Sequence, residues 1–143
     1  MTLPTHASFE VADHTADVAL RACGDSLAHL FISAARGMFT LIAEGETPGD
    51  GYPGEVTVES ADWESLLVSW LRELLFRFEL HSQLPVDFAI RDISPQRLLA
   101  EVQWVNFDPQ HHELLRHIKA VTYHGLEVKQ TDEGWEATLV FDT

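Results

Sequence analysis

The chain has 143 residues, of which 45% are apolar and 22% charged, a composition typical of one globular domain spanning residues 1–143 and not of a disordered chain. Nine Lys and Arg residues against 23 Asp and Glu residues give a formal net charge of −14. This charge disfavours unaided nucleic-acid binding and tight self-association, so we expect a monomer or weak oligomer whose partner is a cation or a basic protein surface.

The sequence also indicates where the protein acts. Its single cysteine, Cys23, cannot form an internal disulfide. The segment from Met1 to Ser8 lacks the basic and apolar regions of a signal peptide, and no apolar run is long enough to span a bilayer. We therefore expect a cytoplasmic protein and not a secreted or membrane protein.

An amphipathic helix is predicted from Leu27 to Ile42, because apolar residues recur there at the spacing of one helical face. Asp25 and Ser26 are suitable N-cap residues for it. Before this helix, a short apolar segment from Phe9 to Ala12 and a strand from Val18 to Cys23 are predicted.

A second helix with the same spacing is predicted from Trp63 to Phe78, capped by Asp62. It follows a strand from Glu55 to Ser60. The glycine- and proline-rich segment from Glu44 to Gly54 is predicted to be a loop.

The last third of the chain alternates between apolar and polar residues, as half-buried strands do. The expected strands are Val86 to Ile90, Leu98 to Trp104, Ile118 to Tyr123 with a continuation from Leu126 to Lys129, and Trp135 to Phe141. The segment from Asn106 to Arg116 is predicted to be an irregular connection. The fold class is therefore α+β, with antiparallel or mixed sheets packed against two amphipathic helices in two layers.

The densest polar cluster runs from Asp13 through His14 to Asp17, between two predicted strands. Carboxylate oxygens suit hard cations such as Ca²⁺ or Mg²⁺. Two carboxylates do not close such a site, and Asp142 and the terminal carboxylate of Thr143 could supply more oxygens. The alternative is a turn in which the aspartates bond their own backbone.

The remaining candidate residues are interpreted as structural or surface residues, with one alternative for Lys119. The four histidines between residues 111 and 124 match no closed zinc pattern and are expected in surface loops, and Cys23 is expected to be a small buried residue. Lys119, beside Arg116 and His117, either faces solvent or presents a cation to a partner's phosphate or carboxylate. The GxSxG, P-loop, HExxH and GxGxxG signatures are absent, so no enzyme is predicted.

Several motifs together resemble the archease family, in the family's order and spacing and over nearly the whole chain. They are Asp-His-Thr-Ala-Asp at 13–17, Gly-Asp-Ser-Leu at 24–27, the helix around Leu66 to Leu75, Ile-Lys-Ala-Val-Thr-Tyr-His at 118–124 and Phe-Asp at 141–142. Two features depart from the family pattern. Trp104 and Val105 stand where a Gly-Glu pair is usual, and His117 stands where an acidic residue often precedes Ile-Lys-Ala.

The resemblance implies a non-catalytic accessory protein of an RtcB-type, GTP-dependent RNA ligase. Such a protein promotes guanylylation of the ligase and multiple turnover in tRNA splicing or RNA repair. A divalent cation, expected to be Ca²⁺ with Mg²⁺ or Mn²⁺ as alternatives, would be held by Asp17, Asp142 and Thr143. Asp13, His14 and Lys119 would contact the partner or take part in its activation.

Two other functions stay open on the sequence. One is a general chaperone or modulator of RNA-modifying enzymes such as a tRNA methyltransferase, which would not need Asp17. The other is a metal-dependent phosphoesterase built on Asp13, His14, Asp17 and Asp142, against which the −14 charge argues because it repels phosphate.

Overall fold

The computed structural model describes residues 7–13, 17–47 and 49–143. Within these ranges the chain forms two helices, α1 (Leu27–Ile42) and α2 (Trp63–His81). The strands are β1 (Ala7–Asp13), β2 (Asp17–Gly24), β3 (Ala43–Gly45), β4 (Tyr52–Glu59), β5 (Gln83–Ser94), β6 (Arg97–Asn106), β7 (His112–Leu114), β8 (Ala120–Thr122), β9 (Lys129–Thr131) and β10 (Gly134–Asp142).

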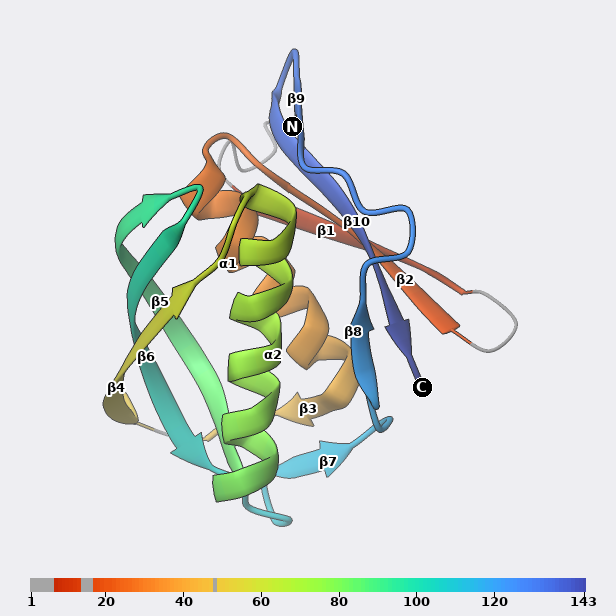
Figure 1. Cartoon of the computed structure of the whole chain (residues 1–143). Coiled ribbons are helices and arrows are strands. Elements are labelled where there is room, and N and C mark those ends of the chain that lie inside the picture. Colours follow the sequence, from red (N-terminus) through yellow and green to blue (C-terminus); the bar gives the residue numbers. More distant parts are fainter. Residues whose placement is uncertain (1–6, 14–16, 48) are drawn as a thin grey trace.

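The strands form three sheets, and every pair in the described ranges is antiparallel (Figure 1). The largest has the order β1-β2-β10-β8, with β9 pairing with β10. The second has the order β4-β6-β5, and β3 pairs with β7 in the third. The predicted α+β class is confirmed.

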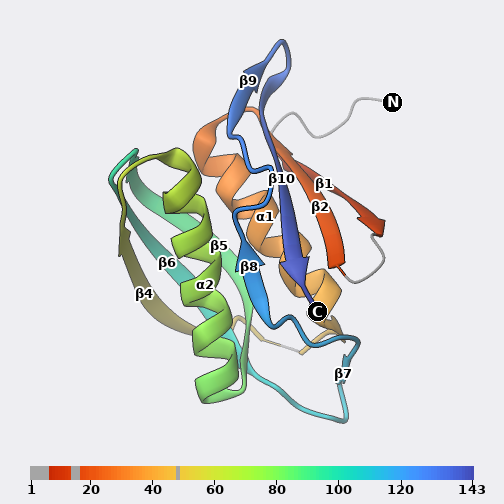
Figure 2. The same ribbon diagram turned by 45° about the vertical axis from the view of Figure 1, so that its right-hand side comes forward.

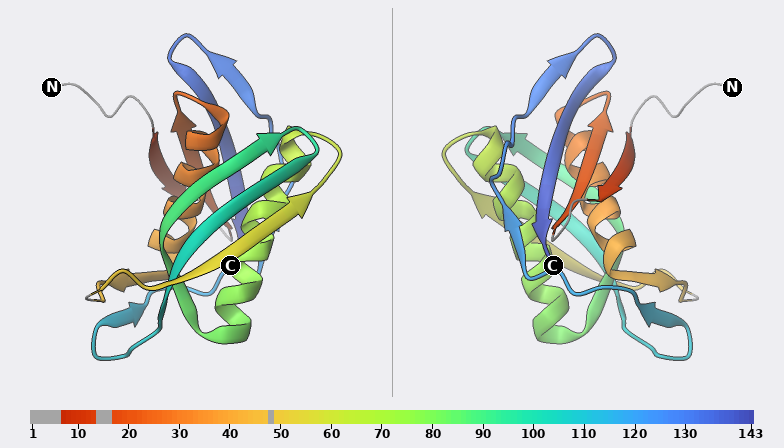
Figure 3. Two further views of the ribbon diagram at one scale, coloured as in Figure 1. Left: turned by 90° about the vertical axis from the view of Figure 1, so that its left-hand side faces the viewer. Right: turned by 90° about the vertical axis from the view of Figure 1, so that its right-hand side faces the viewer.

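Helix α1 lies between the two larger sheets (Figure 3). It contacts β1, β2 and β10 on one side and β5 on the other, and α2 contacts both β8 and the β4-β6-β5 sheet. More of the α1 surface is therefore buried than the single apolar face that the sequence predicts. Ser33, Gly37 and Leu41 are also buried, because sheets cover the helix from two directions. The structure thus has one layer more than the sequence predicts.

Both helix starts agree with the predicted caps. The Ser26 hydroxyl accepts the His29 backbone N–H at 3.1 Å. Asp62 and Ser65 form a reciprocal capping box, in which the Asp62 carboxylate accepts the Ser65 N–H at 2.9 Å. Helix α2 ends at His81, beyond the predicted Phe78, and Ser82 follows it in the left-handed conformation.

The prediction is wrong for two connecting segments. The predicted loop from Glu44 to Gly54 contains the end of β3 and the start of β4, and the predicted irregular connection from Asn106 to Arg116 contains β7. Strands β3 and β7 pair with each other, with Glu44 opposite Glu113. Strands of three residues are too short to show an alternating pattern in sequence.

Several strands of the last third of the chain differ in length from the predicted strands. β5 begins at Gln83 rather than at Val86. The predicted strand from Ile118 to Tyr123 shortens to β8, and the segment from Leu126 to Val128 is not a strand. Neither described helix is both long and apolar enough to cross a membrane.

Candidate functional site

Asp17 and Asp142 lie directly opposite each other in the large sheet. Asp17 begins β2, Asp142 ends β10, and the two residues are register partners in that antiparallel pair. Their neighbours Val18 and Phe141 are also partners and face the buried core. Because side chains alternate along a strand, Asp17 and Asp142 lie on the opposite face, turned away from the helices.

The pair brings two negative charges together. Cβ atoms of direct cross-strand partners lie about 4.5–5.5 Å apart, and like charges at such positions are destabilising. Asp17 is half-buried and Asp142 is exposed. Within the described ranges, no side-chain hydrogen bond or ion pair engages either carboxylate. A hard divalent cation fits this oxygen-only donor pair and would relieve the repulsion.

The other predicted oxygen ligands lie at the same end of the sheet. Thr143 follows Asp142 and is half-buried. Asp13 ends β1 opposite Val18, the residue after Asp17, but its side chain and the whole of His14 lie outside the described residues. In the described parts of the chain, no group of three or more His, Cys, Asp or Glu residues could hold a metal ion. The metal site therefore stays a prediction.

Lys119 is also brought to this end. Its backbone N–H donates to the Asp142 carbonyl oxygen at 2.7 Å, immediately before Ala120 pairs with Asp142 across β8 and β10. Lys119 is exposed. Figure 2 shows the start of β2, the end of β10 and strand β8 side by side. The fold thus joins three segments that are distant in sequence, and we refer to Asp17, Lys119, Asp142 and Thr143 as the acidic end.

Arg72 of α2 also supports this end, a role that the sequence analysis did not assign to it. Its Nη2 donates to the Val121 carbonyl oxygen at 3.0 Å, and its guanidinium lies 5.3 Å from the centre of the Tyr123 ring. Strand β8 lies at the edge of its sheet, so this guanidinium bonds a carbonyl where a further strand would otherwise pair. A charged residue in a largely apolar helix was the available signal, but it did not specify the partner.

The surface-loop prediction is wrong for His112, which is only 6% exposed. Its Nδ1 accepts the Asp108 backbone N–H at 2.9 Å, and its Nε2 lies 2.5 Å from the Thr47 hydroxyl. Its ring also packs on Phe107. These contacts make His112 a structural residue that ties β7 to the segment after β3.

The other histidines of this group, His111, His117 and His124, are exposed, as predicted. His111 bonds the Asp108 carboxylate at 2.9 Å. The Gln110 backbone N–H and the His111 ring both donate to Asp108, which lowers the pKa of its carboxyl group below the ordinary value. Cys23 is half-buried, so the expectation of a fully buried thiol is wrong.

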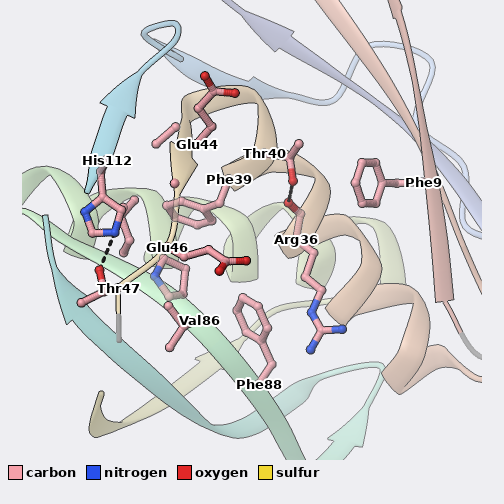
Figure 4. Close-up of a pocket in the computed structure, with 14 residues that line it drawn as sticks. Phe9, Arg36, Phe39, Thr40, Glu44, Glu46, Thr47, Val86, Phe88 and His112 are labelled. Atoms are coloured by element: carbon pink, nitrogen blue, oxygen red, sulfur yellow. Dashed lines mark hydrogen bonds between the residues drawn. The ribbon is translucent and has the colours of Figure 1, made fainter. Parts of the chain in front are cut away.

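A cavity with a volume of 490 Å³ lies elsewhere (Figure 4). Residues of β1, α1, β3, β5 and β7 line it, including Phe9, Arg36, Phe88 and His112. Asp17, Lys119, Asp142 and Thr143, the described members of the predicted site, do not line this cavity. At the acidic end Lys119 and Asp142 are exposed, a geometry that suits contact with a macromolecule.

The departures from the family pattern fall in two environments. Trp104 and Val105 are both buried core residues of β6. The Trp104 ring lies close to Gly54, since a Cβ built on Gly54 would be 3.0 Å from the Trp104 Nε1. His117 is exposed, and its Nε2 lies 4.0 Å from the Glu79 carboxylate.

The sequence profile of the Archease protein family (MTH1598/TM1083) matches residues 9–143. The chain belongs to the archease family. An archease of Methanosarcina mazei is 36% identical over 138 residues, which cover 94% of each chain. An archease of Methanopyrus kandleri is 31% identical, and the match covers 94% of this chain and 98% of the relative.

Solved structures agree with the archease fold. The solution structure of protein 1598 of Methanobacterium thermoautotrophicum has a TM-score of 0.78 and 28% identity, and the match covers 94% of this chain and 98% of that one. The crystal structure of an archease of Thermotoga maritima, described as a possible chaperone, has a TM-score of 0.64. At 19% identity over all of this chain and 98% of that one, it shows a shared fold only.

Proposed function

We propose that this archease is a non-catalytic cofactor of an RtcB-type, GTP-dependent RNA ligase. It would bind a divalent cation, Ca²⁺ by preference, and promote guanylylation and multiple turnover of the ligase. The observation that carries the proposal is the acidic end, where Asp17 and Asp142 are cross-strand partners and Lys119 bonds the Asp142 backbone. An exposed sheet end of this kind can enter the active site of another protein.

We assign a role to each residue of the acidic end according to its charge. Asp17 and Asp142, with an oxygen of Thr143, would hold the cation, and Lys119 would contact a phosphate or carboxylate of the partner complex. A cation presented in this way would neutralise phosphate charge while GTP is attacked. The −14 charge of the archease would favour docking beside the basic surface with which a ligase binds RNA.

The test is RNA ligation by the cognate ligase with GTP and Mn²⁺, under single-turnover and multiple-turnover conditions, with and without the archease. We expect faster ligase guanylylation and sustained turnover with the wild-type chain. Asp17→Ala and Asp142→Ala should abolish this stimulation. Asp92→Ala, which removes an exposed carboxylate from β5, is the matched control and should stimulate normally.

Two results would contradict the proposal. One is stimulation that survives both Asp17→Ala and Asp142→Ala, which would instead support a general chaperone acting through another surface. The other is the absence of stimulation by the wild-type archease at any ratio to the ligase.

A further inference from the structure

A small apolar groove lies next to the acidic end, with a volume of 250 Å³. Leu75 and Phe78 of α2 form one wall, and Leu114, Leu115 and Ile118 form the other. Leu114 and Leu115 are 56% and 45% exposed, although they are large aliphatic residues. The groove therefore offers an apolar interior with exposed apolar edges, large enough for one bulky side chain.

The wall opposite α2 is held in place by the end of α1. The Leu115 backbone N–H donates to the Ile42 carbonyl at 2.7 Å, and Arg116 Nη1 donates to the Leu41 carbonyl at 3.2 Å. These bonds satisfy carbonyl groups that a helix end leaves without partners. The backbone of this wall is thus fixed to the end of α1.

The groove continues into the acidic end through the chain itself. Ile118 is buried at the groove, and the next residue, Lys119, donates its backbone N–H to Asp142. Figure 3 shows the C-terminal end of β10, strand β8 and the later turns of α2 on one side of the molecule. A partner that contacts Lys119 would therefore also reach the groove.

The net charge of the chain indicates the kind of partner. Glu79, Arg116 and His117 are the charged or titratable residues that line the groove, and the whole chain carries −14. A protein surface that binds an RNA backbone is positively charged. Such a surface complements the net negative charge of the chain, and one projecting apolar side chain would fill the groove as an anchor.

We infer that this groove is the docking site for an apolar anchor side chain on the basic surface of the RNA ligase. The inference rests on the proposed function and adds to it a second contact, separate from the carboxylates. The groove would supply most of the affinity, whereas Asp17 and Asp142 would supply the activation.

The experiment measures the affinity of the full archease for the cognate ligase by isothermal titration calorimetry. Leu114→Ser and Leu115→Ser should each weaken binding about tenfold or more, as loss of an anchor contact does. Leu115→Met keeps an apolar side chain and should bind like the wild type. Phe9→Ser, which removes a 40% exposed aromatic residue from β1 at the other edge of the sheet, is the matched control and should bind normally.

Thermal unfolding of each variant separates loss of the groove from loss of the fold. Ligase binding unchanged by Leu114→Ser and Leu115→Ser, in a wild-type chain that binds and stimulates, would overturn the groove and leave the proposed function intact. A wild-type chain that neither binds nor stimulates the ligase would overturn both. Self-association of the archease that Leu114→Ser abolishes would assign the groove to a second copy and overturn the inference.

Discussion

Gly37 of α1 packs directly against Leu20 of β2. A Cβ atom built on Gly37 would lie 2.6 Å from the Leu20 Cδ2 and 2.8 Å from its Cδ1, and Leu20 is fully buried. Glycine at this helix position therefore sets how closely α1 approaches the large sheet. The close approach accounts for a residue that costs a helix interior about 1 kcal/mol relative to alanine.

We expect Gly37→Ala to lower the free energy of unfolding by about 1–2 kcal/mol, because overpacking costs about 1–3 kcal/mol and outweighs the better helix propensity. Urea unfolding measures the change. Leu20→Val in the Gly37→Ala background should recover part of the loss, although Leu20→Val alone is destabilising. A Gly37→Ala variant more stable than the wild type would contradict this packing.

Asp142→Asn should raise the unfolding temperature when metal ions are removed with EDTA, because it ends the repulsion with Asp17. The gain should be modest, a few tenths of a kcal/mol or roughly 1–2 °C, since Asp142 is exposed. If the acidic end binds a cation, Ca²⁺ should stabilise the wild type and have a smaller effect on the variant. Differential scanning calorimetry with EDTA and with excess Ca²⁺ tests both effects. Equal stabilisation of wild type and variant by Ca²⁺ would place any cation elsewhere.

Arg72→Ala should loosen β8 more than it destabilises the whole protein. It removes the donor to the Val121 carbonyl and the contact with Tyr123, at a cost of about 1 kcal/mol. Hydrogen exchange should become faster at the Lys119 amide, which bonds Asp142. Arg91→Ala, which breaks an exposed ion pair with Glu101, is the control and should leave that amide unchanged. Unchanged exchange at Lys119 in Arg72→Ala would show that α2 does not position this segment.

Asp62→Ala should lower the unfolding temperature at neutral pH and have little effect in acid. The Ser65 backbone N–H, and secondarily the Ser65 hydroxyl, lower the pKa of the Asp62 carboxyl group. The stability from this shift is fully present above the ordinary carboxyl pKa of 3.8 and is lost as the pH falls through the lower pKa of the folded state. Thermal scans of both proteins from pH 7 down to strong acid should therefore converge. A constant difference across this range would show that the carboxylate charge is not what stabilises the cap.

The helices could be predicted because apolar spacing and cap residues are visible within each helical segment. The apolar spacing after Ser26 and Asp62 identifies α1 and α2, and the cap residues are those that the structure uses. Strands β3 and β7 could not be predicted, since Ala43 and Leu114 pair only after distant segments meet. The burial of His112 depends in the same way on Thr47 and Asp108.

The acidic end was only partly predictable from the residues themselves. Asp17 and Asp142 were candidate ligands because they are carboxylates at strand ends, but their separation in sequence gives no register. The direct pairing of Asp17 with Asp142 follows from the antiparallel alignment of β2 and β10. The partner of Arg72 and the groove beside Leu114 could not be predicted, because both depend on how α2 packs against later segments.

Strand β10 lies in the middle of its sheet although it is the last strand of the printed sequence, and β2 and β8 each pair with it and not with each other. During synthesis, β2 and β8 therefore cannot join one sheet until β10, the partner of both, has been made. A chain that lacks β10 also lacks Asp142 and cannot bring Asp17, Lys119 and Asp142 together. The acidic end consequently forms only when the strand that joins β2 to β8 is in place.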